Sequence, residues 1–292
     1  MDDHIITATA PGFRAFAAVT TKLAEEARRR HQCYPVAAAA LGRTMTAALL
    51  MAATFKTAET ITIKIAGQGP LGEIVADATA DGTVRGYVHQ PLIDLPLKDG
   101  KLDVGGAVGE GAIYVTRFTG LKQPFTGSAP LVSGEIAEDV TNYLLVSEQT
   151  PSSVGLGVLV SPELHVLAAG GFLIQALPDA ADDAIGLLEK NLAVLAPVSQ
   201  MAADGAAEMI TQVFRGMPVT FYEKKPLAFQ CQCSVEKITK VLISLGAAEL
   251  TEMIEEGQAE VVCHFCNEKY QFSRPKLQEI LQDIQSKKPQ GT

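Results

Sequence analysis

Four of the five cysteines in the chain lie in its last quarter as two close pairs. Cys231 and Cys233 are spaced C-x-C, and Cys263 and Cys266 are spaced C-x-x-C. Zinc takes four soft donors in a tetrahedron, with Zn–S distances of about 2.3 Å, and two close pairs from separate segments provide them. The stretch between the pairs is longer than a compact zinc ribbon uses, so a folded insert must bring them together. We therefore expect one zinc ion per chain on these four cysteines in the reduced protein.

The same cysteines allow other interpretations. Buried thiols without a metal are one, although two pairs rarely converge by packing alone. A purely structural zinc module is another, because most four-cysteine zinc sites are structural. A thiol-disulfide oxidoreductase uses one C-x-x-C at a helix N-terminus, whereas a second pair accompanies it here. We expect His264, inside the C-x-x-C, to be a surface residue, because four thiolates complete the tetrahedron, and Cys33 to be a buried, inert thiol.

The charge of the chain opposes nucleic-acid binding. The net charge is −9, and residues 231–292 carry seven Lys and Arg against nine Asp and Glu. A zinc module that binds nucleic acid needs a basic surface to neutralise phosphates. The one basic cluster, Arg28-Arg29-Arg30, follows Glu25 and Glu26 on an expected helix, which indicates a solvated face.

The N-terminus and the apolar runs indicate a cytoplasmic protein with no membrane segment. Met1-Asp2-Asp3-His4 has no cationic segment leading into an apolar stretch, as a signal peptide would. Arg43, Glu163 and His165 interrupt the best apolar runs, so we expect none to reach membrane-spanning length. Cysteines stay reduced in the cytoplasm, which favours metal ligation over permanent disulfides.

The chain length suggests about two domains, and 47% apolar residues are ample for a substantial core. Helix and hairpin patterns alternate in groups, which favours an α+β fold over a parallel sheet. Helices are expected at Thr20–His31, Pro35–Phe55 and Glu135–Glu148, and strands at Ile61–Ala66, Glu73–Ala78, Thr83–His89, Ala112–Thr119 and within Ser153–Leu177. Asp81-Gly82 is expected to form a hairpin turn.

A G-x-G-x-x-G sequence occurs at Gly67–Gly72, after an expected strand. A dinucleotide fingerprint must open a helix that holds the pyrophosphate, whereas a strand pattern follows here. The glycines are therefore expected to turn a corner of a sheet. The sequence also lacks the G-x-x-x-x-G-K-[ST] phosphate loop, so we expect no use of ATP.

The part of the chain after Pro178 changes character. Ala181–Leu195 and Ala206–Phe214 are expected to be short amphipathic helices, which are stable only when their apolar faces pack on another surface. The last segment is expected to hold a helix at Ser234–Gly246, a helix ending near Gly257, a hairpin of Ala259–Val262 and Tyr270–Phe272, and a final helix. We predict an N-terminal α+β core domain (1–178), a helical linker (179–230) and a small C-terminal zinc-binding α+β module (231–292).

Motifs at several points in the chain carry a family resemblance. They are Cys231-Gln232-Cys233-Ser234, Cys263-His264-Phe265-Cys266, the intervening Leu245-Gly246 and Glu249-Leu250, and Ser147-Glu148-Gln149-Thr150-Pro151-Ser152 with Gly155-Leu156-Gly157-Val158. In these motifs and in the order of its parts, the chain resembles the redox-regulated thirty-three-kilodalton chaperonin, or heat-shock protein 33, over essentially its whole length. The resemblance implies an ATP-independent holdase chaperone that is not an enzyme and has no catalytic residues.

The resemblance also implies how such a protein is regulated. The zinc-bound, reduced form is inactive; oxidation joins Cys231 to Cys233 and Cys263 to Cys266, releases zinc, unfolds the C-terminal module and loosens the linker. The active form is a homodimer that holds unfolding client proteins. Zinc binding in small modules is worth about 10 to 16 kcal/mol, comparable to the stability of a whole domain. Disulfides closing such short loops return only about 2 kcal/mol each, so loss of the metal should unfold the module.

Overall fold

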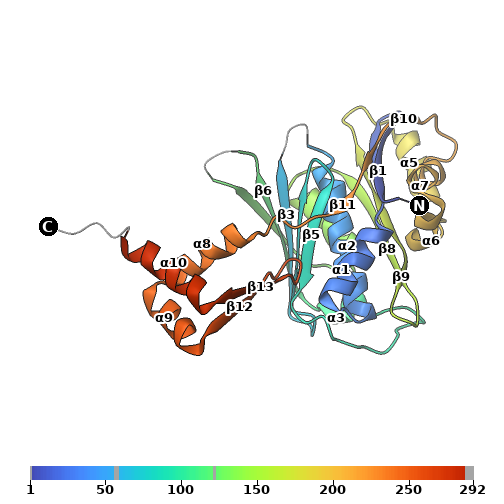
Figure 1. Cartoon of the computed structure of the whole chain (residues 1–292). Helices are drawn as coiled ribbons and strands as arrows, with labels where there is room; N and C mark the ends of the chain where they lie inside the picture. Colours follow the sequence, from blue (N-terminus) through green and yellow to red (C-terminus); the bar gives the residue numbers. More distant parts are fainter. Residues whose placement is uncertain (1, 56–58, 121–122, 287–292) are drawn as a thin grey trace. The chain divides into compact units, whose positions relative to one another are not determined.

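The structure, a computed structural model, describes residues 2–55, 59–120 and 123–286 and divides into two compact units (Figure 1). The first unit comprises Met1–Gln230 and the second Cys231–Thr292. Both units combine helices with antiparallel strands, so the expected α+β class is confirmed. The boundary between the units falls directly before the first cysteine of the C-terminal pairs.

The described residues of the first unit form two sheets. The five-stranded sheet has the order β10-β1-β2-β9-β8, and the six-stranded sheet has the order β11-β5-β4-β3-β6-β7. Neighbouring strands are antiparallel except for β11, which runs parallel to β5. The strands are β1 His4–Ala10, β2 Phe13–Val19, β3 Thr60–Gly67, β4 Glu73–Thr79, β5 Thr83–Val88, β6 Gly111–Phe118, β7 Phe125–Pro130, β8 Ser152–Val160, β9 Val166–Ala176, β10 Thr220–Pro226 and β11 Ala228–Phe229.

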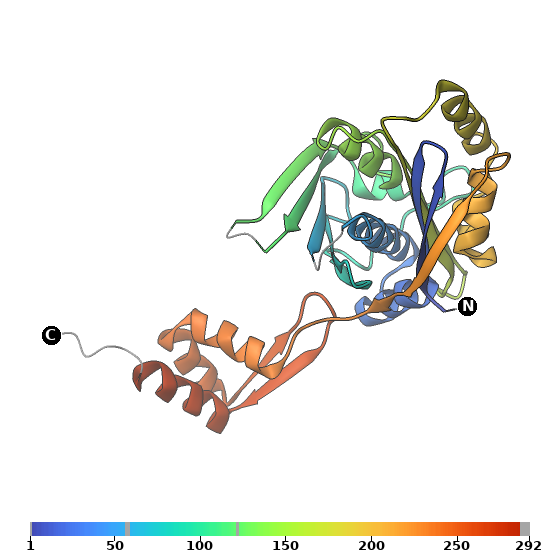
Figure 2. The same cartoon turned by 90° about the horizontal axis from the view of Figure 1, so that it is seen from above.

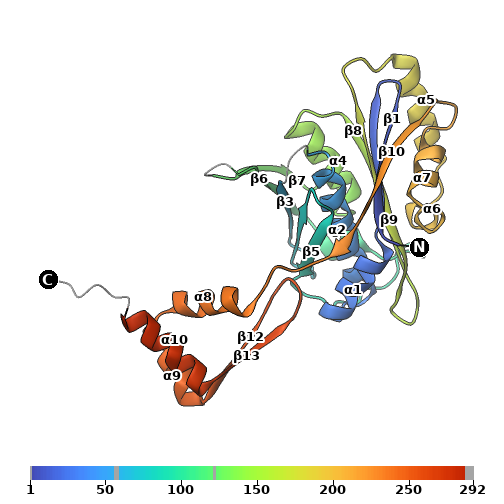
Figure 3. The same cartoon turned by 45° about the horizontal axis from the view of Figure 1, so that its top comes forward.

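The helix α2 (Pro35–Ala52) lies between the two sheets and forms the centre of the main core (Figure 3). We expected Arg43 to keep this apolar run too short to cross a membrane. By length and composition alone, the helix could nevertheless cross one. However, 89% of the helix is buried inside the fold, so α2 is a core helix. The remaining helices next to this core are α1 Thr21–His31, α3 Val104–Val108 and α4 Ala137–Val146.

A second core lies on the other face of the five-stranded sheet. The helices α5 (Asp182–Leu192), α6 (Val198–Asp204) and α7 (Ala206–Val213) cover this face, as the views in Figures 2 and 3 show. Phe13 of β2 packs against Phe214, just after α7, with ring centroids 5.7 Å apart. The expected helices of the 179–230 segment are therefore present, and they bury apolar faces on a sheet, as short helices require.

Several elements were not predicted from the sequence: β1, β2, α3, β7, α6, β10 and β11. The hairpin turn at Asp81-Gly82 is confirmed, since Gly82 has φ 90° between the paired strands β4 and β5. The loop at Gly67–Gly72 leads into β4, as expected. A Cβ atom on Gly67 would lie 2.0 Å from the carbonyl oxygen of Val108, so the backbone of α3 approaches too closely for any other residue.

In the second unit, the described residues 231–286 form three helices and one hairpin. They are α8 Val235–Leu245, α9 Ala247–Glu256, β12 Gln258–Val262, β13 Lys269–Ser273 and α10 Arg274–Ser286. Ile238, Leu242, Leu250, Phe272, Leu277 and Ile280 form its buried core. A core of this size stabilises a domain only weakly, so a bound metal would add substantially to the stability of the unit.

Candidate metal centre

The two cysteine pairs are held by different local structures in the second unit. Cys231 and Cys233 directly precede α8, whose N-cap residue Ser234 accepts a hydrogen bond from the N–H of Lys237 (3.3 Å). Cys263 follows β12, and Cys266 lies in the turn that leads to β13. The fold therefore brings a helix N-terminus and a hairpin turn together, with one pair on each.

The C-x-x-C pair lies in a tight turn closed by main-chain hydrogen bonds. The carbonyl of Cys263 accepts from the N–H of Cys266 (3.3 Å) and of Asn267 (2.7 Å), while its own N–H donates to Glu268 (2.9 Å). Asn267 has φ 59°, a left-handed conformation that asparagine tolerates better than most residues. These bonds orient both cysteine side chains without help from a helix, unlike the C-x-x-C of a thiol oxidoreductase.

The four cysteine sulfurs lie within 4.8 Å of one another. Sγ of Cys231 is 3.7 Å from Sγ of Cys263, and Sγ of Cys233 is 3.4 Å from Sγ of Cys266. A tetrahedral site with Zn–S bonds of about 2.3 Å separates its sulfurs by about 3.8 Å. The arrangement therefore fits a single tetrahedral metal ion. Each of these two close sulfur contacts joins a cysteine of the C-x-C pair to a cysteine of the C-x-x-C pair.

The electrostatics of the cluster favour a cation. Burial raises the pKa of the Cys266 thiol and, more modestly, that of Cys263. The hydrogen bond that the Cys266 thiol shares with Cys233 raises the pKa of Cys266 further, and the charge of Cys231 raises that of Cys263. Thiols in such a site are held as thiolates when a metal ion compensates their charge.

Tyr270 is part of the site, although sequence reasoning named it only as a strand residue. Its hydroxyl donates a hydrogen bond of 3.1 Å to Sγ of Cys233, from the strand β13 beside the turn. Residues that hydrogen-bond to metal ligands orient them and tune their electron density. A tyrosine just after a C-x-x-C turn is the only sequence signal for this role, and it is weak.

The residues expected to lie outside the site do so. His264 is exposed. Cys33 is 1% exposed, and burial raises its pKa to about 12, which keeps the thiol protonated and unreactive. The basic cluster forms ion pairs along α1, from Arg28 to Glu25 (2.8 Å), from Arg29 to Glu26 (2.9 Å) and from Arg30 to Glu26 (2.6 Å). The solvated face that the sequence predicted holds for Arg29, whose side chain is 62% exposed. The side chains of Arg28 and Arg30 are only 14% and 30% exposed, and the guanidinium of Arg30 lies over the ring of Phe229, 5.5 Å from its centroid.

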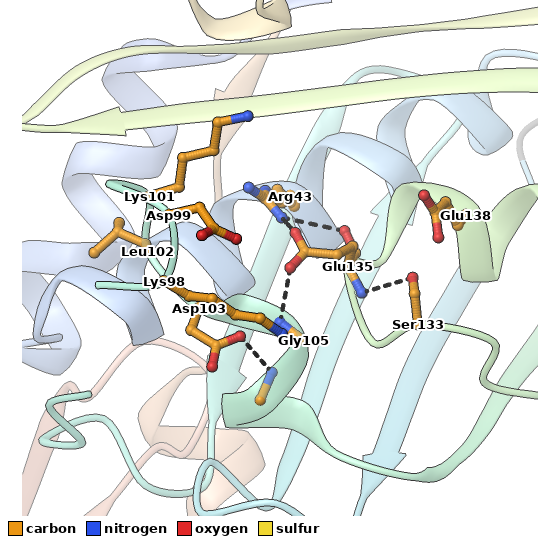
Figure 4. Close-up of a pocket in the computed structure, with 11 residues that line it drawn as sticks. Arg43, Lys98, Asp99, Lys101, Leu102, Asp103, Gly105, Ser133, Glu135 and Glu138 are labelled. Carbon is orange, nitrogen blue, oxygen red and sulfur yellow. Dashed lines mark hydrogen bonds and ion pairs between the residues drawn. The ribbon is translucent and has the colours of Figure 1, made fainter. Parts of the chain in front are cut away.

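A pocket of about 500 Å³ in the first unit carries a mixture of acidic and basic side chains (Figure 4). Arg43 of α2 pairs with Glu135 (2.5 Å), which also accepts a hydrogen bond from the N–H of Gly105 (3.0 Å). Asp103 accepts from the N–H of Gly106 (2.9 Å). The two bonds of Glu135 join α3 to α2, whereas Nε of Arg43 is buried and has no hydrogen-bond partner within the described residues.

The fold and the cluster together define a class of protein: a two-unit α+β protein whose small unit gathers four cysteines that can bind a metal. Four protein ligands leave a tetrahedral metal no open position for substrate, which is typical of structural or sensing sites and not of catalytic ones.

Comparison with known proteins identifies the family. The chain matches the family model described as Hsp33 protein over residues 3–273. It is 49% identical to the 33 kDa chaperonin of Desulforamulus reducens, covering 98% of this chain and 100% of that relative, and 48% identical to the 33 kDa chaperonin of Oceanobacillus iheyensis, covering 97% and 100%. The crystal structure of the 33 kDa chaperonin from Thermotoga maritima matches with a TM-score of 0.92 and 37% identity, over 97% of this chain and 99% of that one. The chain belongs to the Hsp33 family, whose members are chaperonins and not enzymes.

Proposed function

We propose that the protein is a redox-regulated holdase in the cytoplasm that binds unfolding proteins without ATP and is inactive while its four cysteines hold zinc. The observation that carries this proposal is the convergence of four sulfurs within 4.8 Å in a unit with a small core. Cys231, Cys233, Cys263 and Cys266 would be the ligands of one zinc ion. Bound zinc keeps the sulfurs as thiolates, the form that both binds metal and reacts with oxidants.

Oxidation of the thiolates is the switch. Hydrogen peroxide converts one thiolate to a sulfenic acid and releases hydroxide, and a neighbouring thiolate displaces a second hydroxide to form the disulfide. Two such reactions consume two equivalents of peroxide and four thiolates. We assign the disulfides to Cys231 with Cys233 and to Cys263 with Cys266. A thiolate oxidised to a sulfenic acid is a poor metal ligand, so zinc leaves and the hairpin loosens before the two disulfides close.

Loss of the metal unfolds the second unit. Zinc contributes about 10 to 16 kcal/mol in small modules, more than a core of six buried side chains supplies by itself. Two disulfides that close short loops return about 2 kcal/mol each, which does not compensate.

Release of the 179–230 linker is the output of the switch. Its helices α5 to α7 have short lengths and stay helical because they pack on the five-stranded sheet. Once the linker loosens, the apolar face formed by Phe13, Ala15, Ala17, Phe172 and Ile174 is uncovered. Exposed apolar patches of this kind bind unfolded chains or a second copy of the protein, so we assign client binding and dimerisation to residues 1–178.

The test compares reduced and peroxide-treated protein without nucleotide. We expect one zinc per chain before oxidation and none after it, with loss of hydrogen-exchange protection across residues 179–292 and gain of aggregation suppression. A linker that stays equally protected while activity appears would contradict the coupling. Zinc that survives peroxide, with no gain of activity, would instead indicate a purely structural zinc module.

A further inference from the structure

The strand β10 is attached to the first unit in an unusual way. Every residue from Thr220 to Pro226 is exposed, and none belongs to a core cluster in the part of the chain that the structure describes. The strand pairs with β1 as the outermost strand of its sheet. Its hold on the sheet therefore comes largely from main-chain hydrogen bonds. Two exposed side-chain bonds add to them, between the hydroxyls of Tyr222 and Thr9 (3.3 Å) and from the ammonium group of Lys225 to the carbonyl of Ala80 (2.8 Å).

The strand β1, in contrast, is anchored on its other side. It pairs with β2 along its whole length, from His4 to Ala10. Ile5 is 5% exposed in the main core, and Ala8 is fully buried in the core beneath α5 to α7. If β10 detaches, β1 stays in place and presents an edge of unpaired N–H and C=O groups.

The position of β10 in the chain links it to the cysteines. It follows α7, and only Leu227–Gln230 separate it from Cys231. Leu227 is buried, and its N–H donates to the carbonyl of Asp3 (3.1 Å). Under the proposed function, β10 lies between two segments that loosen on oxidation.

We propose that β10 occupies the place that an extended segment of an unfolding protein takes on the edge of β1 after β10 is released. Strand addition to a sheet edge derives affinity from the main chain, and side-chain pockets add specificity. Because β10 is held with its side chains exposed, the edge offers little side-chain selection, and any extended segment can replace it. The inference rests on the proposed holdase function and specifies how the client is bound.

The hydrogen-bond pattern supplies a matched pair of positions. Along an edge strand of an antiparallel sheet, residues whose N–H and C=O groups bond the neighbouring strand alternate with residues whose N–H and C=O groups point to solvent. Because Leu227 donates to Asp3, alternation directs the N–H of Lys225 toward β1 and that of Lys224 toward solvent. Pro226, which has no N–H, stands at a position where the N–H would point to solvent, so the strand loses no hydrogen bond there.

Synthetic peptides with the sequence of residues 220–226 test the site directly. We expect the unmodified peptide to bind oxidised but not reduced protein and to compete with a thermally unfolded client. Methylation of the backbone nitrogen at the Lys225 position should weaken binding about tenfold, whereas methylation at the Lys224 position should leave it unchanged. A peptide of shuffled sequence should bind within about threefold of the original, because the contacts are main-chain.

Variants of the full chain test the same point without oxidant. Lys225→Pro should release β10 and raise aggregation suppression by the reduced, zinc-bound protein about fivefold to tenfold over Lys224→Pro. The ammonium group of Lys225 also donates to the carbonyl of Ala80 (2.8 Å), so Lys225→Ala controls for that contact. In the oxidised wild-type protein, hydrogen exchange should show that client addition restores protection to the β1 amides that bond β10 in the reduced protein, while the amides that bond β2 stay protected throughout.

The outcomes separate this inference from the holdase function. If oxidised wild-type protein suppresses aggregation but the two methylated peptides bind equally, or Lys225→Pro behaves like Lys224→Pro, the β1 site is wrong and the function stands. If the β1 amides that bond β10, as opposed to those that bond β2, stay protected in the oxidised protein before any client is added, the edge is already filled by β10 or by a second copy, which also overturns the inference. If oxidised wild-type protein suppresses no aggregation, the function itself is wrong.

Discussion

The hydroxyl of Tyr270 donates a hydrogen bond of 3.1 Å to Sγ of Cys233, connecting the strand after one cysteine pair to the other pair. Tyr270 therefore contacts a sulfur supplied by a different segment of the second unit. A hydrogen bond to a thiolate orients it and withdraws electron density from it, which affects both metal affinity and reactivity toward oxidants.

Tyr270→Phe should weaken zinc binding by about tenfold, because it removes this donor while keeping the ring in place. Competition with a chromogenic zinc chelator measures the change. Tyr34→Phe, in the first unit, is the matched control and should retain wild-type affinity. Equal affinities for the two variants would show that the hydrogen bond has no role at the site.

Replacing Cys233 and Cys266 together with serine should abolish zinc binding and unfold residues 231–292. These two sulfurs lie 3.4 Å apart and come from different segments, so their loss removes one ligand from each pair. Metal analysis and hydrogen exchange provide the readouts. Cys33→Ala should keep one zinc per chain, and a double variant that also keeps its zinc would refute the ligand assignment.

Peptide mapping after peroxide should find Cys231 joined to Cys233 and Cys263 joined to Cys266. The shortest sulfur separations in the folded cluster, 3.7 and 3.4 Å, join the other combinations. The predicted pairing therefore requires the unit to loosen before the bonds form, when sequence neighbours have the highest effective concentration. Mainly Cys231–Cys263 and Cys233–Cys266 bridges would instead mean that oxidation occurs within the folded cluster.

Cys33, with a pKa of about 12, should stay a free thiol and resist alkylation until the protein is denatured.

Ile210→Ala should make the linker easier to release. Ile210 of α7 is fully buried against the five-stranded sheet, and truncating such a side chain costs about 2 to 5 kcal/mol. We expect faster hydrogen exchange across α5 to α7 in the reduced protein and activation at a lower dose of peroxide. Thr211→Ala, at the exposed next position, is the control. If the variant is activated at the wild-type dose of peroxide despite faster exchange, the packing of the linker on the sheet does not control activation.

Local features of the chain were predictable from the sequence. The cysteine spacing indicated a four-ligand cluster, since close pairs restrict where their sulfurs can go. Apolar periodicity located α1, α2, α4, α5 and most helices of the second unit within a few residues. Glu25 and Glu26 ahead of the three arginines indicated the ion-paired face of α1, because residues three and four apart on a helix are neighbours.

Tertiary structure decided the features that depend on partners distant in the chain. The strand β10 has exposed side chains and pairs with β1 through the main chain, so its sequence carries no alternation that would reveal it. Likewise, Tyr270 reaches Cys233 only because β13 and the segment before α8 fold together. The sequence by itself determined the chemistry of the site and the local elements, because side-chain type and spacing act over a few residues. Strand pairing required the fold because main-chain N–H and C=O groups are the same in every residue except proline and specify no partner. The hydrogen bond at the cluster required the fold because Tyr270 and Cys233 come from segments that are distant in the chain.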